Sequence, residues 1–405
     1  MKYKTYPVSD LIYEIAMGPF GSNIKVDCFV DNGIPVLNGS NLEGFELSEK
    51  SFRYVTEEKA DSLKKANAHK GDVVITHRGT LGQIVYIPQT AQRDRYVISQ
   101  SQFRVKCNKK VLPEYFVYYF HTPIGQHKLL SNASQVGVPA LARPSSTFQK
   151  IEIEIPDIET QKKVVKLIDS LQTQIKTNSE INDNLQQQAA AIFRSWFVDC
   201  IPFGGTVPDE WKNVTLEDIT TLVSRGITPK YADDTDQIVI NQKCIRNHMI
   251  DLSFARSHRP KVINNKWLRF GDLLINSTGD GTLGRAAQVW FQPHNLTVDS
   301  HVTIVRPATE NMIFYIGLWG TQHEKEIESL HTGSTGQTEL PRDRVKAIEI
   351  LLPDKKTLDR FNTLIAPMTT AIVSNQEENT KLASIRDALL PKLMSGEIDV
   401  SDIQL

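Results

Sequence analysis

The sequence predicts an α+β fold. Two mixed α/β domains are separated by a pair of long antiparallel coiled-coil helices, and the halves form a pseudo-twofold internal repeat. Apolar residues recur at alternating steps of three and four in two long segments, which is the spacing of a coiled-coil seam. Both seams carry asparagine at the same two places. Short motifs upstream of the two segments also recur in the same order, about 200 residues apart.

The two long helices are predicted to pair with each other. Their predicted seam residues are Ile168, Leu171, Ile175, Asn178, Asn182, Leu185 and Ile192 in the first helix, and Ile365, Met368, Ile372, Asn375, Asn379, Leu382 and Leu389 in the second. A lone amphipathic helix usually packs on the core of its own domain. Asparagine weakens a seam, however, and is kept there mainly to fix register or partner choice. As a straight helix, residues 165–196 would span roughly 47 Å.

The repeat extends into the segments that precede the helices. The matching stretches are Gly-Thr-Leu-Gly at 79–82 and 281–284, Ile-Glu-Ile at 151–153 and 348–350, and Pro-Asp at 156–157 and 353–354. Proline and aspartate end an extended segment and begin a helix. We therefore expect a first domain at 1–155, a central helix at 156–200, a second domain at 201–352, a distal helix at 353–396 and a loosely ordered acidic tail at 397–405. A further helix is expected from about 113 to 130.

Composition indicates an ordinary soluble, multi-domain protein. Of the 405 residues, 40% are hydrophobic and 23% are charged. No export signal and no apolar run long enough to cross a membrane is visible, so we expect a cytoplasmic protein without a membrane partner. The four cysteines form no Cys-x-x-Cys pair, and the chain has no His-Glu-x-x-His motif and no nucleotide phosphate loop. The sequence thus predicts no catalytic residue, no metal site and no cofactor in this chain.

Positive charge is unevenly distributed. Residues 1–150 hold 19 Lys and Arg against 13 Asp and Glu, and residues 224–271 hold nine against four. Basic patches are often only solvated surface. Here, however, both lie in the N-terminal part of a repeat, as phosphate contacts would require.

Loops in these basic regions supply the predicted DNA contacts, because their side chains are of types that bond phosphate oxygens and base edges. In the first repeat the predicted residues are Ser22, Asn23, Lys25, Asn41, His77, Arg78 and Thr80. In the second repeat they are Arg225, Thr228, Lys230, Tyr231, Gln242, Lys243, Arg246, Asn247 and Arg285.

The chain resembles the DNA specificity subunit of Type I restriction-modification systems. The resemblance rests on the two domain-plus-helix repeats, on Val-Pro-Asp-Glu-Trp-Lys at 207–212, and on Gly-Ser-Thr at 333–335 ahead of Leu340 and the strand at 348–353. The first repeat departs from this pattern. It lacks the Val-Pro-x-x-Trp opening, and it has Ser134 to Leu141 in place of Gly-Ser-Thr.

The resemblance implies a non-catalytic subunit that binds double-stranded DNA at a bipartite, asymmetric target, with one target recognition domain per half-site. It implies as partners two methyltransferase (modification) subunits and two restriction subunits, which would use S-adenosylmethionine, ATP and magnesium. Two alternatives stay open from the residues alone. One is a restriction or modification enzyme with an unrecognised site, and the other is a coiled-coil scaffold that does not bind DNA.

Overall fold

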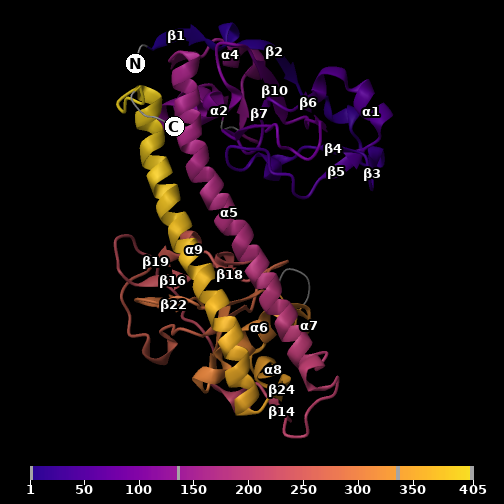
Figure 1. Ribbon diagram of the computed structural model, residues 1–405, viewed down its shortest axis with the longest axis vertical. Helices are drawn as coiled ribbons and strands as arrows, with labels where there is room; N and C mark the ends of the chain where they lie inside the picture. Colours follow the sequence, from indigo (N-terminus) through magenta and orange to yellow (C-terminus); the bar gives the residue numbers. More distant parts are fainter. Residues whose placement is uncertain (1–2, 135–136, 334–337, 402–405) are drawn as a thin grey trace. The chain divides into compact units, whose positions relative to one another are not determined.

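The computed structural model describes residues 3–134, 137–333 and 338–401. The chain divides into two compact units. Unit 1 is formed by residues 1–175 and 380–405, and unit 2 by residues 176–379. Two long helices, α5 (Ile158–Phe197) and α9 (Lys355–Ser395), each contribute residues to both units (Figure 1).

Unit 1 contains a four-stranded antiparallel sheet with the order β2-β10-β7-β8. Its strands are β2 (Ile12–Met17), β10 (Gln102–Cys107), β7 (Asp72–Thr76) and β8 (Ile84–Tyr86). Side chains alternate across β7: Val73 and Ile75 join one hydrophobic core, and Val74 joins another. A strand that is buried on both faces is apolar throughout, which explains its sequence.

The helices of unit 1 cover one face of this sheet. They are α2 (Pro113–His121), α3 (Pro123–Leu130) and α4 (Pro144–Gln149), and the core that they share with the sheet also takes in Ile168 of α5 and Leu393 of α9. The predicted single helix from 113 to 130 is in fact two helices. Proline at 123 disfavours a helical conformation at Thr122, whose extended backbone and hydroxyl cap the start of α3.

The other face of this sheet carries a core shared with a five-stranded sheet of order β3-β5-β4-β9-β6. Its strands are β3 (Phe29–Val30), β5 (Arg53–Val55), β4 (Ile34–Val36), β9 (Arg95–Val97) and β6 (Asn67–His69). Strand β4 runs parallel to β9 and antiparallel to β5. The remaining elements of unit 1 are α1 (Glu57–Ser62) and the pairs β1 (Lys4–Pro7) with β13 (Glu152–Ile155) and β11 (Ala133–Ser134) with β12 (Ala140–Leu141).

Unit 2 repeats this topology. Its four-stranded antiparallel sheet has the order β15-β23-β20-β21, formed by β15 (Thr220–Arg225), β23 (Val302–Pro307), β20 (Leu273–Asn276) and β21 (Ala286–Gln288). A second sheet contains β16 (Ile238–Ile240), parallel to β22 (Leu296–Val298) and antiparallel to β19 (Arg256–Ser257). The predicted internal repeat is therefore a repeat of strand order and direction.

The strand pair that precedes the long helix also recurs in unit 2. Strand β14 (Lys212–Thr215) pairs with β24 (Glu349–Leu352) as β1 pairs with β13. The helices are α6 (Ile313–Gln322), α7 (Glu324–Ser329) and α8 (Arg342–Lys346), and a short hairpin joins β17 (Ile245–Arg246) to β18 (Met249–Ile250). None of the described helices is both long and apolar enough to cross a membrane.

A buried ion pair occupies the same place in both sheets. Arg104 lies 3.3 Å from Asp72 in unit 1, and Arg306 lies 2.7 Å from Asp272 in unit 2. Each guanidinium also donates to backbone carbonyls that precede the central strand, at Lys65 in unit 1 and at Asn265 and Trp267 in unit 2. Burial raises the pKa of both aspartates, and the arginines partly offset this rise. The pair thus ties the segment before the central strand to the sheet.

The two long helices pack antiparallel. In unit 2, Asn178 donates to Asn379 (3.0 Å) and Asn375 donates to Asn182 (2.8 Å). In unit 1, Arg386 donates to Gln172 (2.7 Å). Partner numbers therefore fall along α9 as they rise along α5.

The predicted seam residues are all buried or partly buried. The seam ends in the hydrophobic cores, where Ile168 lies in that of unit 1 and Ile365 in that of unit 2. The predicted fold class, mixed α/β domains with a pair of long antiparallel helices, is confirmed.

The C-terminal tail differs from the prediction. Ile398 packs against the core of unit 1, Val400 is fully buried, and Lys163 donates to the carbonyl of Ser401. The expectation of a loosely ordered tail is wrong for residues 397–401, because Ile398 and Val400 pack into the hydrophobic core of unit 1. Residues 402–405 lie outside the described part of the chain.

The buried ion pair gives a stability prediction. Replacing Arg306 with alanine leaves the carboxylate of Asp272, which is 1% exposed, without its cation. We expect Arg306→Ala to lower the free energy of unfolding by roughly 3–5 kcal/mol, measured by urea denaturation. The control is Arg342→Ala, which removes an exposed arginine beside Asp343 and should change the free energy of unfolding by less than about 0.5 kcal/mol. Equal effects of the two substitutions would contradict the assigned role.

Candidate nucleic-acid interface

Several loops of unit 1 meet at one end of the four-stranded sheet. The amide of Gly18, after β2, donates to the carbonyl of Gln102 (2.8 Å), and the amide of His77, after β7, donates to that of Ser101 (2.8 Å). A Cβ at position 18 would lie 1.9 Å from the carbonyl oxygen of Ser99, so only glycine allows this approach. The predicted residues at 22–25 and 77–80 therefore belong to one surface.

The same loops meet in unit 2. The amide of Gly226 donates to the carbonyl of Val302 (3.1 Å), and the amide of Ser277 donates to that of His301 (2.8 Å). A Cβ at position 226 would lie 2.0 Å from the carbonyl oxygen of Val298. The hydroxyl of Thr278 lies 2.8 Å from Nδ1 of His301, which links the β20–β21 turn to the β22–β23 turn. Each unit thus presents an equivalent cluster of loops.

Four of the predicted contacts in unit 1 are exposed on this surface: Asn23, Lys25, Arg78 and Thr80. The side chain of Ser22 lies outside the described part of the structure. His77 is partly buried, and its Nε2 donates to the carbonyl oxygen of Gln100 (3.1 Å). Burial lowers the pKa of His77, so the ring is neutral at pH 7 and holds the turn without offering a charge to phosphate.

The prediction for Asn41 is corrected by the structure. Asn41 is fully buried. Its amide nitrogen donates to the carbonyls of Ser48 (2.9 Å) and Lys50 (2.7 Å), and its Oδ1 accepts from the amide of Asn38 (2.9 Å). These bonds hold the 3₁₀ turn Gly39–Leu42 against the segment that follows it. Asn41 therefore positions the loop and has no free group to offer DNA.

Arg225 also serves the fold. Its guanidinium forms an ion pair with Glu339 and donates to the carbonyl of Leu340 (2.7 Å). It thereby anchors Glu339 and Leu340, which follow the Gly-Ser-Thr motif; residues 334 and 335 of that motif lie outside the described part of the chain. In the corresponding segment of unit 1, Leu141 of β12 bonds the carbonyl of His77, while residues 135–136 are not described.

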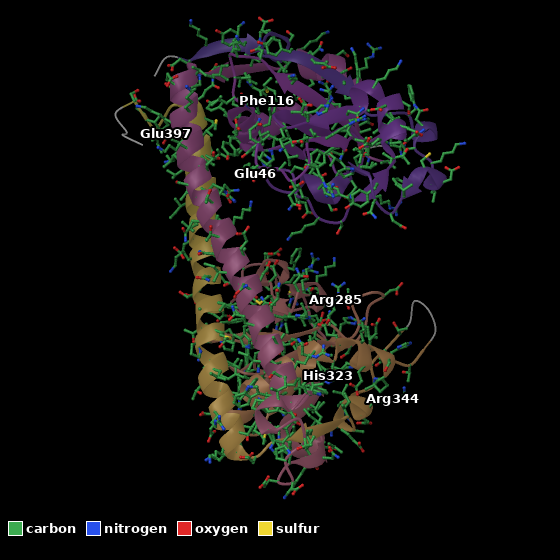
Figure 2. All side chains as sticks on the ribbon, turned by 45° about the vertical axis from the view of Figure 1, so that its right-hand side comes forward. Glu46, Phe116, Arg285, His323, Arg344 and Glu397 are labelled. Atoms are coloured by element: carbon green, nitrogen blue, oxygen red, sulfur yellow. The ribbon has the colours of Figure 1, made fainter. Side chains whose placement is uncertain are left out.

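The predicted contacts that are exposed in unit 2 are Thr228, Lys230, Tyr231, Lys243, Arg246, Asn247 and Arg285. Arg285 donates to the carbonyl of Gly281 (2.8 Å), and Figure 2 labels its side chain. Arg246 donates to the carbonyl of Lys243 and lies 4.3 Å from the centre of the Phe254 ring. Gln242 is partly buried, and its side-chain oxygen accepts from Thr278 (3.2 Å).

Unit 2 also holds a group of three cations near these loops, Lys261, Lys266 and Arg342. Lys266 donates to the carbonyl of Gly226 (2.9 Å). Its pKa is lowered by burial and further by the charges of Lys261 and Arg342. Three cations that lie close enough to interact give this part of unit 2 a positive potential, which attracts a polyanion.

One duplicated arginine–aromatic contact was not predicted from the sequence. Arg53 lies over the ring of Phe29, with 5.3 Å between the guanidinium carbon and the ring centre, and Arg256 lies 3.6 Å over the ring of Tyr231. The separation between the two arginines, 203 residues, is close to that of the other repeated motifs and was the signal available in the sequence.

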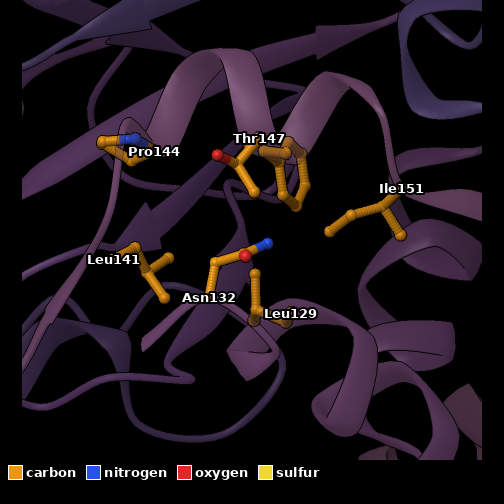
Figure 3. A pocket seen from close by; sticks show the side chains of 7 residues that line it. Leu129, Asn132, Leu141, Pro144, Thr147 and Ile151 are labelled. Carbon is orange, nitrogen blue, oxygen red and sulfur yellow. The ribbon is translucent and has the colours of Figure 1, made fainter. Parts of the chain in front are cut away.

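The described residues form no group of three His, Cys, Asp or Glu side chains that would hold a metal ion. A small pocket in unit 1 is lined by Leu129, Asn132, Leu141, Pro144, Thr147, Phe148 and Ile151 (Figure 3). Its lining is largely apolar and includes no charged side chain, so it offers no acid, base or nucleophile beyond one threonine hydroxyl.

Known proteins match the chain as follows. Residues 21–187 match the family model of the Type I restriction modification DNA specificity domain. The Type I restriction enzyme MjaIX specificity subunit of Methanocaldococcus jannaschii is 24% identical over 422 residues, covering 97% of this chain and 93% of that protein. The Type I restriction enzyme HindI specificity subunit of Haemophilus influenzae is 24% identical over 412 residues, covering 81% of this chain and 87% of the relative.

The fold has a solved counterpart. The Type I restriction-modification system S subunit from M. genitalium aligns with a TM-score of 0.59 at 13% identity, covering 97% of this chain and 96% of that one. The chain is thus similar to specificity subunits over most of its length, and the predicted resemblance to them is confirmed. The match to the DNA specificity domain supports a role in DNA sequence recognition.

The corrected role of Asn41 gives a second prediction. Asn41→Ala removes three partly buried hydrogen bonds to the backbone and leaves no side chain to replace them. We expect the free energy of unfolding to fall by roughly 2–3 kcal/mol, with the loss seen as a lower denaturation midpoint. Asn23→Ala, at an exposed position in the same unit, is the control and should change the free energy of unfolding by less than about 0.5 kcal/mol. A stable Asn41→Ala protein with impaired DNA binding would restore the original prediction.

Proposed function

We propose that the chain recognises a bipartite, asymmetric DNA sequence, with one half-site read by each repeat. The observation that carries this proposal is the duplicated sheet topology, in which equivalent loops meet at the same end of each four-stranded sheet. The exposed side chains on the two loop clusters differ. Asn23, Lys25 and Arg78 lie on one, and Lys230, Lys243 and Arg285 lie on the other. Two clusters with different side chains are suited to two different half-sites.

We assign the recognition domains to residues 1–155 and 201–352 and the spacer to the helices at 156–200 and 353–396. A straight helix of the 40 residues of α5 measures about 60 Å, which exceeds one turn of DNA at roughly 34 Å. The paired helices would therefore separate the half-sites by a fixed, unread spacer. Hydrogen bonds between Asn178 and Asn379 and between Asn182 and Asn375 oppose rotation of α5 relative to α9.

The chain acts in this proposal as a non-catalytic subunit. Two methyltransferase subunits and two restriction subunits would supply the chemistry, using S-adenosylmethionine, ATP and magnesium. The names of the matched relatives support this division of labour, since each is called the specificity subunit of a Type I restriction enzyme. We propose the helix pair as the docking platform, because it is the element shared by both halves of the chain.

Methylome sequencing tests this function. We expect the host to carry methylated adenines at one split, non-palindromic sequence, and this modification to disappear when the gene is deleted and to return when it is restored. Expression of the methyltransferase subunit without this chain is the control and should leave the sequence unmethylated. Methylation that persists without this chain would contradict the proposal. A methylated sequence that is continuous, and not split into two half-sites, would also contradict it.

A further inference from the structure

The duplicated arginine–aromatic pairs occupy equivalent positions in the two units. In unit 1, Arg53 of β5 stands opposite Val36 of β4, and Phe29 of β3 stands opposite Val55. In unit 2, Arg256 of β19 stands opposite Val239 of β16, and Tyr231 bridges to His258. Each member of the first pair therefore has a counterpart 202 or 203 positions later.

The same hydrogen bond holds the strand of each arginine to the loop cluster. The side-chain amide of Asn38 donates to the carbonyl of Ser51 (3.3 Å), two residues before Arg53. The side-chain amide of Asn241 donates to the carbonyl of Phe254 (2.7 Å), two residues before Arg256. In unit 2, a bond from the amide of Arg259 to the carbonyl of Lys230 (2.9 Å) joins this strand to the exposed basic loop. In unit 1, the side chain of Gln102 donates to the carbonyl of Asn38 (3.3 Å), so both arginines are linked by hydrogen bonds to the loops of the candidate nucleic-acid interface.

Both guanidinium groups are exposed and unneutralised. Among the described residues, the side chains of Arg53 and Arg256 form neither an ion pair nor a hydrogen bond, and the specific contact of each is with the ring beneath it. A cation–π contact with a ring restrains the guanidinium and leaves its N–H groups available to an acceptor. An arginine side chain held in this way can donate hydrogen bonds to an acceptor on another molecule.

The acceptor follows from the duplication. Exposed residues elsewhere in the two loop clusters differ between the repeats, as base-reading residues for two half-sites should. An arginine–aromatic pair is present in both units. We therefore expect it to bind what both half-sites have in common, which is the phosphate backbone. We propose that Arg53 with Phe29 and Arg256 with Tyr231 are two equivalent phosphate-binding pairs, one on each half-site. This inference rests on the proposed DNA-binding function.

The test measures binding by the complex of this chain with its methyltransferase partner. The probes are a duplex carrying the methylated sequence and a random-sequence duplex, titrated between about 50 and 200 mM salt. We expect Arg53→Ala and Arg256→Ala each to weaken binding to both duplexes alike, by roughly tenfold or more, and to reduce the salt slope by about one. Tyr231→Leu and Phe29→Leu keep the charge and should weaken binding roughly two- to fivefold.

Lys109→Ala is the control. Lys109 is also an exposed cation, but it follows the end of β10 at Cys107, away from Gln102 and the loop cluster, and it lies outside the helix pair proposed as the docking platform. It should leave the salt slope unchanged. Unchanged slopes for Arg53→Ala and Arg256→Ala would overturn the inference, as would a methylated sequence that becomes degenerate at one base while random-duplex binding stays normal. A wild-type complex that failed to prefer its target duplex would instead count against the proposed function.

Discussion

The seam between α5 and α9 is the constraint on which the rest of the structure depends. Each helix is continuous from one unit into the other, so their register determines which part of α9 faces each part of α5. A purely apolar seam tolerates sliding, because one apolar side chain can replace another at little cost. The asparagines remove this freedom, since Asn182 must meet both Asn375 and the carbonyl of Ile372 to satisfy its buried amide.

The sheets use the same principle of satisfying buried polar groups. The Arg104–Asp72 and Arg306–Asp272 pairs each fill a polar gap between a central strand and the segment that precedes it. Because the arginine also bonds backbone carbonyls, the segment cannot shift without exposing an unpaired charge. The loops at the far end of each sheet are therefore carried on a rigid support, and their side chains can differ between the repeats without disturbing the fold.

Elements with a local signal were predictable from the sequence. The seam positions follow from spacing alone, and the Pro-Asp junctions mark where α5 and α9 begin. The exposure of loop residues was not predictable, since it depends on contacts far along the chain. Asn41 resembles a surface residue in a turn, yet it is buried by the segment around Ser48 and Lys50. Arg225 ends β15 where a basic loop begins, but it is neutralised by Glu339, which is more than 100 positions away. The stacked pairs were missed because Phe29 and Arg53 are far apart in sequence and meet only across β3 and β5.

The most direct measurement removes one heptad from both helices, residues 171–177 and 380–386, and maps the methylated sequence. These segments face each other, as the Gln172–Arg386 bond shows, and their removal leaves Asn178 and Asn379 in place. Seven residues correspond to about 10 Å, or about three base pairs. The account predicts that both half-sites stay the same while the spacer becomes shorter by about that amount. An unchanged spacer, or a change in either half-site with the spacer intact, would contradict it.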